Sequence, residues 1–126
     1  MNMKKNMVVW FEIPVLDMNR AKRFYETVFN IEVTVQDFGG VMMGFFPSEK
    51  DQPGAMGSLI QHESYIPSHS GSLLYFSSEN VQMELDRVEG AKGKILQRKT
   101  QISPEHGHMA TFEDTEGNRI ALYSET

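Results

Sequence analysis

Hydrophobic and polar residues follow one another along the chain in two similar cycles. In the first cycle, a β-branched and aromatic run over 7–15 predicts a buried strand. Apolar residues spaced three and four apart over 18–29 predict an amphipathic helix, with Asp17 as its N-cap and Asn30 as its left-handed end. Strands are then predicted over three further segments, 31–36, 41–46 and 58–62.

The second cycle repeats this order after a linker over 65–71. A strand over 72–77 precedes Asn80, which takes the place of Asp17, and the next apolar residues have the i, i+4, i+7 spacing of a second helix: Val81, Leu85 and Val88. Three strands are predicted after this helix, over 94–98, 109–113 and 119–124.

The two cycles predict the fold class. Asn80 lies 63 positions after Asp17, and the pattern repeats although the letters differ, which indicates a tandem duplication. We therefore predict a single α+β domain over 1–126, with two βαβββ modules at about 7–62 and about 72–124. Their strands are expected to form a cupped mixed sheet around a shared cavity.

Composition narrows the classes of function. The 126 residues fit one domain, and the absence of Cys excludes disulfides, thiolate zinc sites and thiol nucleophiles. The net charge of −5 argues against a nucleic-acid partner. No apolar run is long enough to span a membrane or to form a signal peptide, so we expect no membrane partner and a cytoplasmic location.

Four segments resemble one known family. Phe11–Glu26 and Phe112–Leu122, with its acidic-Gly-Asn turn, resemble the opening and closing segments of the vicinal oxygen chelate superfamily, which includes glyoxalases, bleomycin resistance proteins and extradiol dioxygenases. Ser72–Phe76 and Arg87–Leu96 fit its second module. The resemblance implies paired βαβββ modules and often a homodimer. Its enzymes hold one divalent metal that chelates two neighbouring substrate oxygens.

The metal-ligand positions that the resemblance implies are filled by the wrong residues. Three of them correspond to Trp10, Leu73 and Ala121, none of which can donate a lone pair to a cation. The fourth lies on the strand over 58–62, where Gln61 is the only weak candidate. We therefore expect no metal and no other cofactor.

Strand parity predicts which residues line the cup. Glu12 shares parity with Trp10, and in a partly apolar cup it is a weak candidate for a general base; the alternative is a rim carboxylate paired with Arg119 or a Lys. Tyr75 and Tyr123 are also placed in the cup by parity. The predicted ligand cavity consists of Trp10, Glu12, Leu73, Tyr75, Ala121 and Tyr123.

Two other groups of residues allow more than one interpretation. His106 and His108 form an H-x-H motif of the kind that metal proteins use, but no third ligand is near, so we place them at a loop-to-strand entry. An apolar group at the first-module loop is interpreted as core packing first and as an adaptable ligand wall second: Met42, Met43, Phe45, Phe46 and Met56.

Three functions are compatible with these residues. The first is binding of a small molecule, flat or cationic, as in bleomycin resistance proteins that work without a catalytic metal. The second is a metal-dependent lyase, isomerase or dioxygenase with a displaced site, or an enzyme that uses Glu12. The third is a subunit whose cup is vestigial. Whether the chain is an enzyme is left open, and a homodimer is expected from the resemblance alone.

Overall fold

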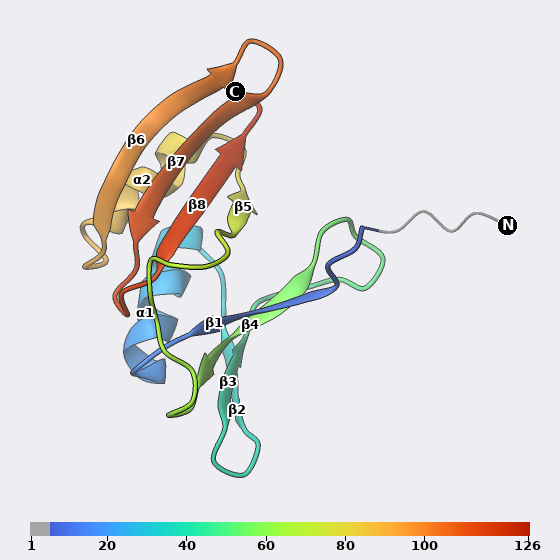
Figure 1. Cartoon of the computed structure of the whole chain (residues 1–126), viewed down its shortest axis with the longest axis vertical. Helices are drawn as coiled ribbons and strands as arrows, with labels where there is room; N and C mark the ends of the chain where they lie inside the picture. The colour runs from blue at the N-terminus through green and yellow to red at the C-terminus, as the bar shows by residue number, and fades with distance from the viewer. Residues whose placement is uncertain (1–5) are drawn as a thin grey trace, which may run out of the picture.

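The computed structural model describes residues 6–126 and contains two helices and eight strands (Figure 1). Their bounds, in chain order, are β1 Trp10–Pro14, α1 Met18–Phe29, β2 Thr34–Asp37, β3 Met42–Phe45, β4 Met56–Gln61, β5 Tyr75–Ser77, α2 Val81–Val88, β6 Lys94–Ser103, β7 Gly107–Glu113 and β8 Arg119–Ser124.

The strands form two four-stranded mixed sheets with the same topology. The strand orders are β1-β4-β3-β2 and β5-β8-β7-β6, and in each sheet the first and last strands of the unit pair in parallel while the other neighbours are antiparallel. The predicted α+β class with two βαβββ units is therefore confirmed.

Both predicted helix starts are present. The Asp17 carboxylate accepts a hydrogen bond from the backbone N–H of Arg20 at 3.1 Å, and the Asn80 side-chain oxygen accepts one from the N–H of Gln82 at 3.0 Å. Asn30 ends α1 with a φ of 54°, in the left-handed region. These caps fix where each helix leaves its preceding strand.

Strand β6 differs most from the prediction, which ended at Arg98. Three register shifts interrupt its pairing with β7, so apolar and polar residues do not alternate regularly beyond Ile95. Most of its side chains are exposed, which removes the hydrophobic signal that would reveal a strand of this length.

One hydrophobic core joins the two units. Each helix covers one face of its own sheet, and α1 and α2 also contact each other along one side of the molecule (Figure 1). Phe24, Tyr25 and Leu85 are fully buried in this core, together with Phe112 and Leu122 from the second sheet. Neither helix within residues 6–126 is long and apolar enough to cross a membrane.

Candidate functional site

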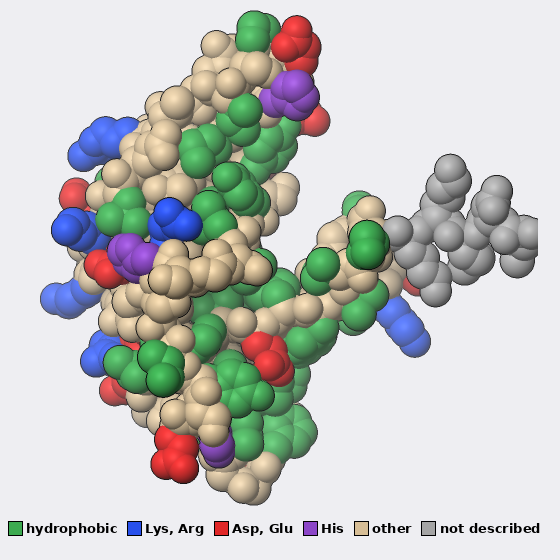
Figure 2. Space-filling model, viewed as in Figure 1, with side chains coloured by type: hydrophobic (Ala, Val, Ile, Leu, Met, Phe, Trp, Pro, Cys, Tyr) green, Lys and Arg blue, Asp and Glu red, His purple; other side chains and the backbone are tan. Residues whose placement is uncertain are grey.

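A cavity opens between the two units, where β5 faces the start of β4. Its volume is about 500 Å³. Figure 2 shows a hollow on this side of the molecule with hydrophobic side chains on its floor. The lining residues are Val8, Phe11, Phe29, Ile31, Phe46, Pro47, Pro53, Gly54, Ala55, Met56, Gly57, Leu74, Tyr75, Phe76, Ser77 and Glu84.

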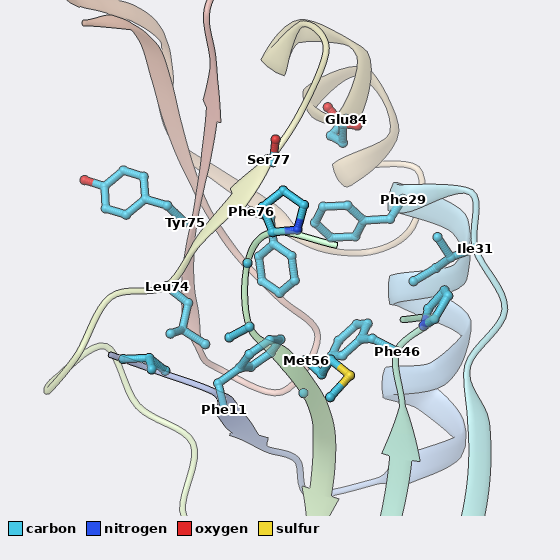
Figure 3. Close-up of a pocket in the computed structure, with 16 residues that line it drawn as sticks. Phe11, Phe29, Ile31, Phe46, Met56, Leu74, Tyr75, Phe76, Ser77 and Glu84 are labelled. Carbon is cyan, nitrogen blue, oxygen red and sulfur yellow. The ribbon is translucent and has the colours of Figure 1, made fainter. Parts of the chain in front are cut away.

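Four phenylalanine rings form the floor of this cavity (Figure 3). The ring centroids of Phe11, Phe46 and Phe76 lie 5.7–5.8 Å from one another, and that of Phe29 lies 5.0 Å from that of Phe76. These distances are typical of favourable aromatic pairs. The rings are half-buried, so each packs against the core and leaves part of its surface toward the cavity.

Local sequence explains how the rings reach this position. Phe11 has the parity of the core residue Ile13 in β1, and Gly57 stands beside it on β4. A Cβ atom at Gly57 would collide with the Phe11 ring. Glycine at this position therefore leaves space for the ring to lie over β4. Phe76 is the core-facing residue of β5 between the exposed Tyr75 and Ser77.

Among residues 6–126, Glu84 of α2 is the only charged side chain in the lining. Glu84 is 9% exposed, and its carboxylate accepts a hydrogen bond from the hydroxyl of Ser78, the residue that follows β5. In Figure 3 it lies beyond Phe29 and Phe76, on the α2 side. The wall is otherwise mostly apolar, which is the composition of sites that bind organic molecules.

The predicted cup residues that belong to strands lie on the sheet faces turned away from the helices. In the second sheet, Tyr75 pairs with Ala121 and Ser77 with Tyr123, so the side chains of Tyr75, Ala121 and Tyr123 share the face away from the helices. Tyr75 is 54% exposed and is the one member of the predicted set that lines the cavity. Leu73 is half-buried just before β5.

In the first sheet, Trp10 and Glu12 lie on the face of β1 that is turned away from the core. The Trp10 ring meets the Phe45 ring edge-on, with 6.0 Å between their centroids. Glu12 is exposed, and it makes no ion pair with any residue in 6–126. The alternative of a rim ion pair between Glu12 and Arg119 is therefore absent from the structure.

Two residues that line the cavity from the core side, Phe46 and Met56, have a ligand wall as the second of their two sequence interpretations. The sequence does not predict the other three phenylalanines as part of a site. Phe11, Phe29 and Phe76 follow the core pattern of their elements. Hydrophobic periodicity identifies them as core residues, but which core residues border an opening depends on how the two units meet.

The residues at the metal-ligand positions that the resemblance implies are not suited to hold a metal. Trp10, Leu73 and Ala121 offer no ligand atom, and the Gln61 side-chain oxygen is engaged with the backbone N–H of Met18 at 2.7 Å. No group of three or more His, Asp or Glu side chains within residues 6–126 lies close enough together to hold an ion.

The two histidines of the H-x-H motif lie where the sequence predicts. His106 belongs to the turn before β7, and its Nδ1 atom is 2.6 Å from the Ser103 hydroxyl. His108 is the second residue of β7, and its Nδ1 atom is buried without a hydrogen-bond partner in the described part of the chain.

A buried polar network at the β7–β8 turn joins the second unit to the first. Tyr25 of α1 donates a hydrogen bond to Asp114 Oδ2 at 2.6 Å, and Asn118 Nδ2 donates to the carbonyl of Pro14 at 2.7 Å. Burial, together with the Asp114 carboxylate, raises the pKa of Tyr25 well above 10, so the phenol stays protonated and donates. The sequence pattern predicts only a turn here.

Glu116 is the centre of the same turn. Its carboxylate accepts hydrogen bonds from the backbone N–H groups of Leu16 and Asp17, both at 2.8 Å, and forms a bidentate pair with Arg20 at 2.7 and 2.9 Å. Burial alone would raise the pKa of Glu116, but these hydrogen bonds together outweigh it and lower that pKa. The acidic-Gly-Asn turn therefore anchors the start of α1.

Comparison with known proteins agrees with this architecture. The model of the Glyoxalase/Bleomycin resistance protein/Dioxygenase superfamily matches residues 7–122. A glyoxylase-like domain-containing protein of Didymella fabae is 27% identical over 117 residues, which cover 88% of each chain.

Solved structures share the fold at low sequence identity. A glyoxalase/bleomycin resistance protein from Albidiferax ferrireducens T118 superposes with a TM-score of 0.72 at 16% identity, covering 96% of this chain and 100% of that one. TnmS3, an antibiotic binding protein from Streptomyces sp. CB03234, superposes with a TM-score of 0.66 at 22% identity, covering 99% and 100%. The chain spans 45% of the length of glyoxalase I from Zea mays, to which it is also similar in structure.

Proposed function

The chain belongs to the Glyoxalase/Bleomycin resistance protein/Dioxygenase superfamily, and we propose that it binds a small organic molecule in the cavity between its two units. In this proposal binding needs no metal. Three of the ligand positions that the resemblance implies offer no ligand atom, and the Gln61 oxygen at the fourth is bonded to the N–H of Met18. The ligand is an apolar, aromatic molecule that lies against the four phenylalanine rings.

One observation carries this proposal: a cavity of about 500 Å³ exposes Phe11, Phe29, Phe46 and Phe76 at one place. That volume lies within the range of small-molecule sites, and aromatic rings favour flat partners. The fold is shared with TnmS3, which is described as an antibiotic binding protein, so a cavity of this kind is compatible with the fold.

Of the predicted cup residues, Tyr75 is the one that the proposed binding site includes. This tyrosine lines the cavity and also lies beside Ala121 on the outer face of the second sheet. We propose that its phenol contacts the ligand at the cavity mouth. Trp10, Glu12, Leu73 and Tyr123 remain a predicted extension of the binding surface.

The proposal is tested with Nile red, an uncharged aromatic dye whose fluorescence rises in apolar sites. Ala55→Trp places a large side chain in the cavity lining, and Gln52→Trp places the same side chain on the same exposed loop outside it. We expect saturable binding of one dye per chain, at least tenfold weaker in Ala55→Trp and unchanged in Gln52→Trp.

Either of two results would overturn the proposal. One is the absence of saturable binding by the folded wild-type chain. The other is equal dye affinity in Ala55→Trp and the wild type, with circular dichroism spectra that show both to be folded.

We also propose that the chain forms a homodimer. Several apolar side chains of the first segment are exposed, among them Met7, Val8 and Val9, at 97%, 62% and 70%. Such a contiguous apolar segment favours a protein partner, and a second copy would bury it. Light scattering coupled to size exclusion is expected to give twice the mass of 14.4 kDa, and a monomer at micromolar concentration would refute the proposal. The cytoplasmic location remains a prediction.

A further inference from the structure

A second, smaller cavity lies on the helix side of the molecule, between α1 and the loop that joins α2 to β6. Its volume is about 310 Å³. The α1 residues in its lining follow the i, i+3, i+4, i+7 spacing of one helix face, and the second unit contributes the rest. The lining consists of Arg20, Arg23, Phe24, Thr27, Gly90, Ala91, Lys92 and Thr115, which we call the basic groove.

The charge of the basic groove is opposite to that of the whole chain. Three of its eight lining residues are cations and none is a carboxylate, although the protein has 17 acidic against 12 basic residues. Figure 2 shows Lys and Arg side chains along this edge of the molecule, opposite the hollow of the aromatic cavity, with some Asp and Glu side chains between them. A concentration of one sign of charge in a concave site raises the local concentration of ligands of the other sign.

The cations retain unused capacity for an anion. Arg20 gives its Nε and Nη2 atoms to Glu116, and its Nη1 atom makes no hydrogen bond with any residue in 6–126. Arg23 and Lys92 form no ion pair within the same residues, and both side chains are exposed. Arg23 and Lys92 are therefore the two groove cations without an ion pair in 6–126, whereas Arg20 is paired with Glu116 and lies near further carboxylates.

The backbone holds Lys92 in an unusual conformation. Its φ is 79°, in the left-handed region that glycine or asparagine normally occupies after a helix. The backbone N–H groups of Ala91, Lys92 and Gly93 donate hydrogen bonds to carbonyl oxygens at or just after the end of α2. These three N–H groups are therefore not free to bind an anion, which could contact only side chains of this segment. The presence of lysine in a backbone conformation that disfavours it is consistent with a functional role for its ammonium group.

We propose that the basic groove binds the dianionic group of a small molecule, either a phosphate or a pair of carboxylates. Arg23 and Lys92 contact the anion directly, and Arg20 adds its free Nη1 donors. The hydroxyl of Thr27 completes the polar wall above Phe24. This site is separate from the aromatic cavity and shares no lining residue with it.

The experiment is a titration followed by the backbone amide signals in ¹H–¹⁵N NMR, at pH 8 and low ionic strength. Inorganic phosphate and succinate distinguish the two sources of the dianion, and trimethyl phosphate is the uncharged control. We expect saturable shifts centred on Thr27, Gly90–Lys92 and Thr115. Binding should weaken as salt is raised, because these charges are exposed and screened.

Three variants decide whether the groove is the site. Lys92→Asn removes the ammonium with a residue that tolerates the left-handed conformation, and Arg23→Gln changes an exposed side chain, so both are expected to fold. Each should weaken binding of the dianion about threefold to fivefold. Lys94→Gln removes an exposed cation two residues from Lys92 but outside the groove, and should leave binding unchanged. Failure of both dianions to saturate, or equal weakening by Lys94→Gln, would overturn the proposal.

Discussion

A single carboxylate, that of Glu116, accepts hydrogen bonds from four residues, one of which is its neighbour Thr115. Its side chain is fully buried and receives hydrogen bonds from two backbone N–H groups ahead of α1 and from the Arg20 guanidinium. A buried carboxylate is stable only when its lone pairs are bonded in this way. The first helix is therefore held in place by a residue about a hundred positions later in the chain.

This arrangement predicts a pH dependence of stability. The folded-state pKa of Glu116 is lowered from 4.5, so its contribution is fully present above pH 4.5 and is lost as the pH falls through the folded-state value. Glu116→Gln is expected to lower the free energy of unfolding at pH 7 by about 1–3 kcal/mol. Urea unfolding from pH 7 to pH 3 should show this difference shrink below pH 4.5.

The matched control is Glu32→Gln, which changes an exposed carboxylate with no hydrogen bond or ion pair in the described chain. It should leave the free energy of unfolding within about 0.5 kcal/mol of the wild type. A constant difference between wild type and Glu116→Gln at every pH would contradict the assignment.

At the scale of elements, the loop between α2 and β6 packs tightly against α1. A Cβ atom at Gly93 would collide with the Phe24 ring and with the carbonyl oxygen of Glu113, whereas one at Gly90 would have its nearest neighbour, the Arg87 carbonyl oxygen, at 3.9 Å. Neither glycine has a positive φ, so the difference between them is one of space.

We therefore expect Gly93→Ala to destabilise the protein by about 1–3 kcal/mol, because Phe24 lies in the core and cannot move freely. Gly90→Ala, in the same loop, should change stability by no more than about 0.5 kcal/mol. Thermal unfolding of the two variants measures this contrast. Equal melting temperatures would contradict the prediction and show that the loop shifts to accommodate the added methyl group.

The elements were largely predictable from sequence, whereas the site was not. Asp17 and Asn80 identify both helices because a cap is a local signal that a few neighbouring residues carry. The end of β6 was missed because its bulges break the alternation on which strand prediction depends. The phenylalanine cavity depends on contacts between residues far apart in sequence, such as Phe11 and Phe76, and no local pattern encodes them.

At the scale of the molecule, the two units share one core. Buried residues of α1, α2 and both sheets form a single cluster, and the turn at Asp114–Asn118 bonds to Tyr25 and Pro14 of the first unit. Separation of the units would expose apolar surface from each and would break buried hydrogen bonds. The whole chain is therefore expected to unfold cooperatively.

Two spectroscopic probes test this cooperativity. Trp10 is the only tryptophan and lies in β1, so its fluorescence reports on the first unit, whereas far-ultraviolet circular dichroism reports on both. We expect the same midpoint from both probes in urea. Two separate transitions would mean that the units are stable independently.

The left-handed lysine in the loop between α2 and β6 has a consequence for protein engineering. A residue other than glycine or asparagine at φ 79° costs about 1 kcal/mol, so Lys92→Gly is expected to raise the melting temperature. Selection of variants for heat resistance alone would thus favour replacement of Lys92 and loss of its ammonium group. Lys92 marks a position where a more heat-resistant variant would have a weaker attraction for anions.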